Sequence, residues 1–329
     1  MNIRSPLWAA TLMLAAAPVL AAGPPPLTPT RLNAFTFDVT GAVETFANGV
    51  DDHGVIVGYF DDDVTLAHGF VLKNGLLKTF DAPGAVNITE HYGINNHGEL
   101  SGAYYDGTAL VGYLKLGSVF QAVTPGGPYT IARGLNDAGL TVGQYAVSGT
   151  DHGFFWDGKH FADLMVPGST LTHAQGIDNL DRIVGFSVDA AGLQHGFKLI
   201  GGVYTPFDVS GADSYGTRAF GISDKGWIVG AYGDAVGRHG FLRVGGVDYR
   251  IDLPGALWTE VHGVNGNLGE IVGAWGDPDG VHIHAFLASP TLPEPVPVPV
   301  PEPRTWALFA AGLLAMALRR RQRAPDTND

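Results

Sequence analysis

One glycine recurs six times along the chain at intervals of about 43 residues, each time after a short, mostly apolar run. These marker glycines are Gly58, Gly102, Gly143, Gly185, Gly230 and Gly273. A second marker follows about a dozen residues later and usually reads His-Gly-Phe. Its histidines are His68, His152, His195, His239 and His284, and Val111 takes their place in the second copy. Two markers that keep step over six copies define a repeat protein.

Each copy divides into four short runs with the spacing of β-strands, separated by turn residues. In the third copy these runs cover residues 130–135, 140–145, 153–156 and 159–164. Two-residue loops such as Asp157-Gly158 join the third and fourth runs, and this composition favours tight hairpin turns. The sequence therefore predicts an all-β fold built from four-stranded antiparallel units.

Six units of this size predict a six-bladed β-propeller over residues 35–289. The copies are longer than the coils of a parallel β-helix, which disfavours that alternative. The sixth copy stops after its third run, at residues 284–287, whereas residues 35–38 resemble the fourth runs of other copies. We predict that this N-terminal strand completes the last blade, closes the ring and covers an exposed sheet edge.

The charge of the chain narrows the choice of partners. The 329 residues carry a formal net charge of −13, and without the terminal segments 28 acidic residues face 13 basic ones, near −15. Nucleic acid is excluded as a partner because its binding depends on cationic side chains. The chain has no cysteine, which excludes disulfides and cysteine-based zinc sites.

Residues 1–22 have the anatomy of a secretory signal peptide. Arg4 precedes an apolar stretch at residues 7–20, and Ala21 and Ala22 are small residues suited to cleavage. We expect signal peptidase to remove this segment and to leave a linker at residues 23–34. A retained N-terminal anchor is the alternative.

The C-terminal end has three parts. Residues 290–303 contain seven prolines and predict a stiff polyproline II spacer. Residues 304–323 are expected to form a hydrophobic helix, short for a bilayer span, with an arginine cluster suited to the cytoplasmic side. Residues 324–329 are a short tail.

This C-terminal block resembles the PEP-CTERM sorting signal of Gram-negative bacteria. The residues that carry the resemblance are Val300, Pro301, Glu302 and Pro303 before the helix, and Arg319, Arg320 and Arg321 after it. The resemblance implies recognition by an exosortase, with membrane contact through the C-terminal helix before processing. It also implies removal of the helix and delivery to the cell surface or an extracellular biofilm matrix.

The repeat body resembles the bacterial extracellular HAF repeats, named after the tripeptide that stands here as His284-Ala285-Phe286. The resemblance covers almost all of residues 35–287 and implies an exported repeat protein, without a defined activity. Two copies depart from the pattern: the second has Val111, and the fourth has Asp181 where a turn glycine stands in other copies.

The repeat histidines could bind metal or act as general bases. Because they recur once per copy whereas a catalytic site is asymmetric, we predict that they form hydrogen bonds between neighbouring strands. Aspartates Asp38, Asp81, Asp208 and Asp252 recur similarly and are expected to cap turns, with a calcium-binding ring of carboxylates as the alternative.

Two further groups of residues leave alternatives open. The acidic loops at residues 61–63 and 277–280 offer oxygen ligands to calcium, or are simply solvated. Aromatic residues after the marker glycines either pack between blades or stack on sugars. They are Tyr59, Tyr104, Tyr145, Tyr232 and Trp275.

The sequence predicts an exported binding or structural propeller at the cell surface or in the matrix, with extracellular polysaccharide as the candidate ligand. No catalytic residue is assigned, no cofactor is predicted, and the ligands of any metal are unknown. One alternative is an exported carbohydrate-active hydrolase or lyase with carboxylates from different blades. Another is a structural envelope protein stabilised by calcium.

Overall fold

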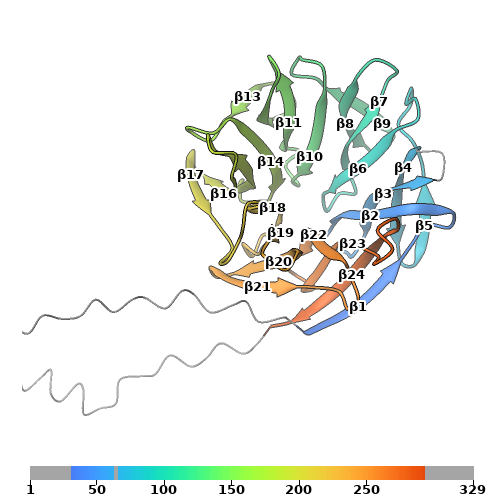
Figure 1. Ribbon diagram of the computed structural model, residues 1–329. Coiled ribbons are helices and arrows are strands. Elements are labelled where there is room, and N and C mark those ends of the chain that lie inside the picture. Colours follow the sequence, from blue (N-terminus) through green and yellow to red (C-terminus); the bar gives the residue numbers. More distant parts are fainter. Residues whose placement is uncertain (1–30, 63–65, 293–329) are drawn as a thin grey trace, which may run out of the picture. The chain divides into compact units, whose positions relative to one another are not determined.

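The computed structural model describes residues 31–62 and 66–292, where the regular structure is β-strand throughout (Figure 1). The 24 strands of this part form four sheets of four strands and one of eight. The eight-stranded sheet is two four-stranded units joined by a single parallel bridge between Glu44 and Ile283. The prediction of an all-β fold built from four-stranded antiparallel units is confirmed.

The strands follow one order in each unit. The first strands are β2 (Ala42–Val50), β6 (Thr89–Ile94), β10 (Thr130–Leu135), β14 (Leu171–Ile177), β18 (Thr217–Ile222) and β22 (Trp258–Asn265). The second strands are β3 (Ile56–Asp62), β7 (Leu100–Tyr105), β11 (Thr141–Val147), β15 (Ile183–Val188), β19 (Ile228–Gly233) and β23 (Glu270–Gly276). The third strands are β4 (Ala67–Lys73), β8 (Leu110–Leu116), β12 (Thr150–Trp156), β16 (Gln194–Ile200), β20 (Arg238–Val244) and β24 (Ile283–Thr291). The fourth strands are β5 (Leu76–Thr79), β9 (Val119–Val123), β13 (Phe161–Leu164), β17 (Val203–Phe207), β21 (Val247–Ile251) and, from the start of the chain, β1 (Arg31–Phe37).

The first strands lie innermost and contact one another in a cycle. β2 contacts β6, the contacts continue through β10, β14 and β18, and β22 returns to β2. Figure 1 shows the units arranged around a common centre, as in a propeller. The runs predicted for the third copy agree with β10 to β13 to within three residues at each end.

The marker glycines stand on the second strands, opposite an aromatic ring of the third strand. Gly143 pairs in register with Phe154, which is fully buried. A Cβ atom at Gly143 would overlap the carbonyl oxygen of Ile131 on the first strand and press against the Phe154 ring. The same contact recurs in every unit, with Phe70, Tyr113, Phe154, Phe197, Phe241 and Phe286 as the rings. The two sequence markers keep step because they are the two sides of this contact.

A second set of six glycines holds the first strands together around the axis. These waist glycines are Gly49, Gly93, Gly134, Gly176, Gly221 and Gly263, each just after a β-bulge. A Cβ atom at Gly134 would lie 3.0 Å from the Cα of Gly176 in the next unit. The cycle ends with Gly263, whose nearest neighbours include the backbone of Asn48 and Gly49 in the first unit. Only a residue without a side chain admits so close a backbone approach.

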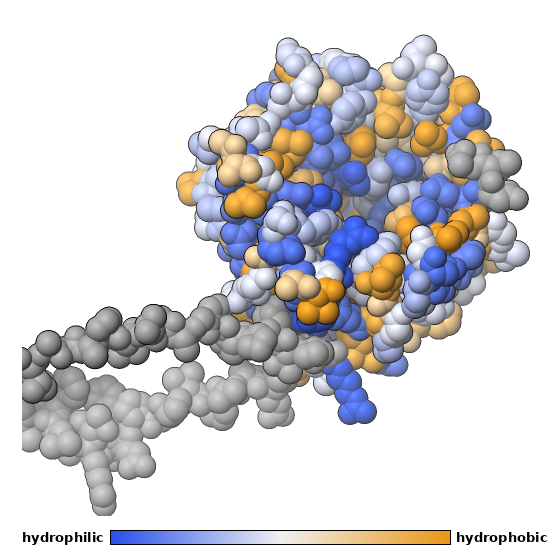
Figure 2. Space-filling model, viewed as in Figure 1, coloured by the Kyte–Doolittle hydropathy of each residue, from blue (hydrophilic) through white to orange (hydrophobic). Residues whose placement is uncertain are grey.

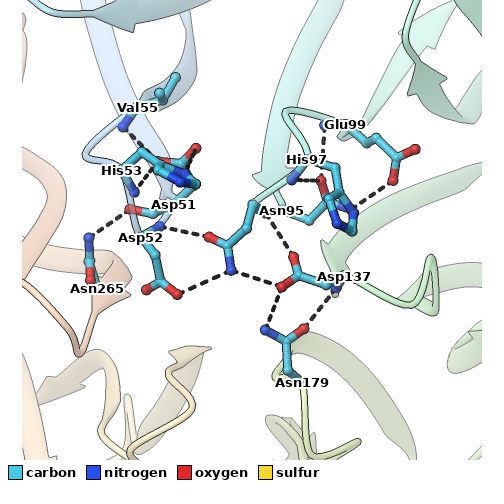
Figure 3. Close-up of polar contacts among 11 residues, drawn as sticks. Asp51, Asp52, His53, Val55, Asn95, His97, Glu99, Asp137, Asn179 and Asn265 are labelled. Atoms are coloured by element: carbon cyan, nitrogen blue, oxygen red, sulfur yellow. Dashed lines mark hydrogen bonds and ion pairs between the residues drawn. The ribbon is translucent and has the colours of Figure 1, made fainter.

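The turns after the first five first strands are linked in series by alternating carboxylates and amides, here called the Asx ring, part of which is drawn in Figure 3. Its members are Asp52, Asn96, Asp137, Asn179 and Asp224. Each of the first four donates its backbone N–H to a side-chain oxygen of the next member, over 2.8 to 2.9 Å. Asn96 also donates its side-chain N–H groups to Asp52 and Asp137. The turn residues of the sequence therefore also connect neighbouring units.

The N-terminal strand completes the last unit. β1 pairs antiparallel with β24 over seven residue pairs, from Arg31 with Thr291 to Phe37 with Ala285. The predicted approach of residues 35–38 to residues 284–287 is confirmed. The pairing also reaches further than expected, because residues 31–34 belong to the strand rather than to the linker predicted at residues 23–34. Pro290 is accommodated because the pairing of β24 with β23 already ends at Ala288.

The predicted signal peptide, spacer, hydrophobic helix and arginine cluster lie outside the described residues. Within residues 31–62 and 66–292, no helix is long and apolar enough to cross a membrane.

Replacing Gly143 by alanine tests the marker contact. The added methyl group must displace backbone or the Phe154 ring, so we expect the free energy of unfolding to fall by about 3 kcal/mol. Denaturant titration measures the change. Gly237→Ala is the control, because a Cβ there meets open space, and it should change stability by less than about 0.5 kcal/mol. Equal effects of the two variants would contradict the role assigned to Gly143.

Replacing Asn96 by aspartate tests the Asx ring. The variant removes a donor shared by Asp52 and Asp137 and adds a third negative charge between them. We expect a loss of about 1–2 kcal/mol near neutral pH, because a shared donor is lost and like charges are brought together. Denaturant titration measures the loss. Asn267→Asp, which replaces an exposed amide outside the ring, is the control, and an equally large loss there would count against the ring.

Candidate functional site

An axial cavity of about 330 Å³ lies on one side of the waist glycines. Its wall comes from the first strands of all six units and from parts of β3, β11 and β15. The Asx ring follows the waist glycines along the first strands of five units and so borders the other end of the axis. Figure 2 shows that the surface is hollowed at the common centre of the strand units, with hydrophilic side chains around the hollow.

The residue directly before each waist glycine lines the cavity and differs in every unit. These residues are Asn48, Tyr92, Arg133, Gln175, Phe220 and His262. The glycine that follows is constant, and the next residue is always Val, Ile or Leu. A repeated scaffold thus carries an asymmetric lining, which is the property expected of a ligand site.

One side of the cavity combines an arginine with aromatic rings. The guanidinium carbon of Arg133 lies 3.9 Å from the ring centroid of Tyr92. Tyr92 donates its hydroxyl to Glu90 over 2.6 Å. Burial raises the pKa of Glu90, and the hydrogen bond from Tyr92 and the charge of Arg133 offset part of that effect. The neighbouring rings of Phe46 and Tyr59 are stacked, 4.8 Å apart.

Another part of the lining is the carboxylate of Glu260, which already has hydrogen-bond and ion-pair partners. Glu260 accepts a hydrogen bond from the Tyr215 hydroxyl at 3.0 Å and lies 3.2 Å from an Arg238 nitrogen and 3.3 Å from Nε2 of His262. Burial alone would raise the pKa of Glu260, but His262, Arg238 and Tyr215 together outweigh it and hold the pKa at about 2. Nδ1 of His262 lies 3.0 Å from the side-chain oxygen of Asn48, which links β22 to β2.

His173 and Arg218 complete the polar lining. Nε2 of His173 lies 2.9 Å from Asp151, yet burial dominates and lowers the pKa of His173 to about 4. Arg218 donates from Nε to the side-chain oxygen of Gln194, and its guanidinium lies 4.6 Å from the Tyr215 ring centroid. The lining therefore offers cationic donors, amides and aromatic faces, and its one carboxylate is already bonded.

The repeat histidines lie outside the cavity lining. Each faces an aspartate at or just after the fourth strand of its unit, with 2.8 to 3.0 Å between Nδ1 and a carboxylate oxygen. The pairs are His68 with Asp81, His152 with Asp163, His195 with Asp208, His239 with Asp252, and His284 with Asp38. The hydrogen bond to Asp208 raises the pKa of His195. The last pair joins the two ends of the described chain.

The other predicted candidates are dispersed. Of the aromatic residues after the marker glycines, Tyr59 lines the cavity, Tyr232 is buried in its unit, and Trp275 packs on His284. In the loop at residues 277–280, Asp279 accepts hydrogen bonds from the His282 ring and from nearby backbone N–H groups, which lower its pKa to about 2. In the described part of the chain, no group of three or more His, Asp or Glu is placed to hold a metal ion.

Sequence reasoning missed the cavity because it followed the constant positions of the repeat. The informative signal was the single variable residue in front of the waist glycine, as in Arg133-Gly134-Leu135 and Gln175-Gly176-Ile177. The residue type at this position changes in every copy, so the repeated fold does not constrain it. Such a position can therefore be adapted to bind a ligand.

Replacing His173 by glutamine tests the buried imidazole. Because the pKa of His173 is about 4 in the folded chain and about 6.5 when unfolded, the unfolded state binds an extra proton between these values. Stability is therefore full above about pH 6.5 and falls toward pH 4. We expect the free energy of unfolding of His173→Gln to fall less steeply than that of the wild type between about pH 6.5 and pH 4, by about 1 kcal/mol per pH unit. Denaturant titration at several pH values measures both slopes. His160→Gln, an exposed histidine, is the control, and a wild-type slope in His173→Gln would contradict the assignment.

Comparisons with solved structures show resemblance in fold alone. A mutant of AofleA from Arthrobotrys oligospora is 12% identical, with 79% of this chain and 87% of that chain covered and a TM-score of 0.51. A protein assigned as TolB from Agrobacterium tumefaciens is 14% identical, with coverages of 75% and 91% and a TM-score of 0.51. Aleuria aurantia lectin, a fungal lectin with a six-bladed β-propeller fold, is 12% identical, with coverages of 83% and 97% and a TM-score of 0.47.

The sequence comparisons concern the C-terminal end. No curated protein matches the chain. A family model for the PEP-CTERM protein-sorting motif matches residues 299–321, which include Val300 to Pro303 and Arg319 to Arg321. The chain thus carries a PEP-CTERM motif, which indicates exosortase processing and export to the cell surface or extracellular space.

Proposed function

We propose that this protein is an exported, exosortase-processed six-bladed propeller, closed by its N-terminal strand, that binds carbohydrate in the axial cavity. In this proposal a signal peptide at residues 1–22 directs export, and the body is an HAF-repeat protein held at the cell surface or in its matrix. The observation that carries the proposal is the asymmetric lining at the axis of a repeated scaffold.

The chemistry of the lining favours a small polyhydroxylated ligand. Tyr59, Tyr92 and Phe220 supply aromatic surface on which the apolar face of a sugar ring could stack. Gln144 and Gln175 supply amide groups, which donate to and accept from hydroxyls. A volume of about 330 Å³ lies at the lower end of the range of small-molecule sites and suits one sugar ring.

Hydrolysis of a carbohydrate is the second candidate function. The carboxylates of the site favour binding without hydrolysis. A glycosidase needs two carboxyl groups that flank the scissile bond. Glu260 is the one carboxylate among the described lining residues, and its oxygens are bonded to Tyr215, Arg238 and His262. Glu90 lies behind Tyr92 and is bonded to its hydroxyl.

Filling the cavity tests the proposed function. The wild-type protein is first tested on a glycan array to find the sugars that it binds. We expect the Gln175→Trp variant to lose binding to these sugars, because the indole would occupy the space of the sugar ring. Gln121→Trp, on the outer strand β9, is the control and should bind as the wild type does. Circular dichroism melts verify that both variants fold. Glycan binding that survives in a folded Gln175→Trp protein, or a wild type that retains no glycan, would contradict the proposal.

A further inference from the structure

The seven arginines of the described residues fall into three groups. In the described part of the chain, four arginines form ion pairs with carboxylates: Arg182, Arg238, Arg243 and Arg250. Arg31 is exposed on β1. The two remaining arginines, Arg133 and Arg218, form no ion pair with a described residue, and both line the axial cavity.

Two arginines without ion pairs are unexpected in a body with so many carboxylates. The repeat body is near −15, so carboxylates are abundant as partners for any arginine. The cavity nevertheless contains two arginines and one carboxylate, and that carboxylate, Glu260, is already bonded to Arg238 and His262. Among the described lining residues, arginines therefore outnumber carboxylates, and the neighbouring Glu90, which lies outside the lining, is bonded to the Tyr92 hydroxyl. This balance favours an anionic ligand.

The hydrogen bonds of the two arginines are incomplete. Nε of Arg133 is buried and has no hydrogen-bond partner among the described residues. A buried donor without an acceptor costs free energy, so the bonding of this guanidinium is incomplete. Among the described residues, Arg218 has one hydrogen-bond partner, the uncharged side-chain oxygen of Gln194. Both guanidinium groups thus have N–H donors to offer to a ligand.

Aromatic rings hold both guanidinium groups in place. Arg133 lies 3.9 Å from the ring centroid of Tyr92, and Arg218 lies 4.6 Å from that of Tyr215 and 5.1 Å from that of Phe186. A ring that stacks on the face of a guanidinium leaves the N–H donors at its edge free. Those donors match the two oxygens of a carboxylate, which arginine binds in a bidentate manner.

We propose that the axial cavity binds an acidic sugar whose carboxylate is held by Arg133 and Arg218. This inference rests on the proposed function and names the class of its ligand. The amides and aromatic rings of the lining bind the hydroxyls and the apolar face of the same ring, as they would for a neutral sugar.

The test is calorimetric titration of the purified exported protein with D-glucuronate and with D-glucose, which differ at one carboxylate. We expect glucuronate to bind at least about tenfold more tightly. Arg133→Gln and Arg218→Gln should each reduce this preference by about tenfold, whereas Arg31→Gln on the exposed strand β1 should retain it. Thermal melts verify that each variant is folded, and a change in either Arg133 or Arg218 alone keeps the test informative if the other variant fails to fold.

The outcomes separate the two proposals. Equal binding of both sugars, or a preference that survives both arginine variants, overturns the acidic-sugar assignment and leaves carbohydrate binding in place. Binding of neither sugar, or glucuronate binding that persists in Gln175→Trp, overturns the axial carbohydrate site as well. A parallel titration with oligogalacturonate identifies the source, because tighter binding of the oligomer than of the monomer assigns the site to segments of an acidic polysaccharide.

Discussion

The structure depends on the close approach of six backbones around one axis. At the waist glycines each first strand lies against the backbone of the next, and Gly263 returns the contact to Asn48 and Gly49. A methyl group at Gly134 would already lie 3.0 Å from Gly176, so the spacing of the ring is set by the absence of side chains at these positions. The bulge just before each waist glycine then frees the preceding residue from sheet packing. Constant glycines thus set the framework, and the variable residues beside them determine its chemistry.

The same distinction explains how much could be predicted from the sequence. The runs of the third copy agree with β10 to β13, and the likeness of residues 35–38 to a fourth strand predicted their pairing with β24. These predictions succeeded because constant positions report local structure directly. The Asx ring could not be predicted, since Asn96 and Asp137 are typical turn residues and only the ring brings them within hydrogen-bond distance. The cavity was missed because the six lining residues in front of the waist glycines share neither type nor charge, and their one common feature in the sequence is the glycine that follows.

The acidity of the body and the cationic character of the cavity are compatible on physical grounds. At physiological ionic strength, exposed charges are screened beyond about 8 Å, so the carboxylates of the outer surface have little influence at the axis. Inside the cavity the effective dielectric constant is lower and nearby charges act more strongly. Local pairing then decides the result: Arg238 is neutralised by Glu260, whereas Arg133 lies over the Tyr92 ring and forms no ion pair with a described residue.

The last unit, formed by β22, β23, β24 and β1, determines when the axial cavity is complete during folding. Its cavity residues, Glu260 and His262, belong to the last unit, whose outer strand β1 comes from the start of the chain. Strands this far apart in sequence pair only when a long loop is closed, so β1 pairs with β24 only after the whole body is available. Asn48 and His262, which bond across this junction, come together in the same step. The end that leads toward the sorting motif continues from β24, which is paired on one side with β23 and on the other with β1. A force applied through that end is therefore resisted by two strand ladders of the closing unit, which also holds the last wall of the cavity in place.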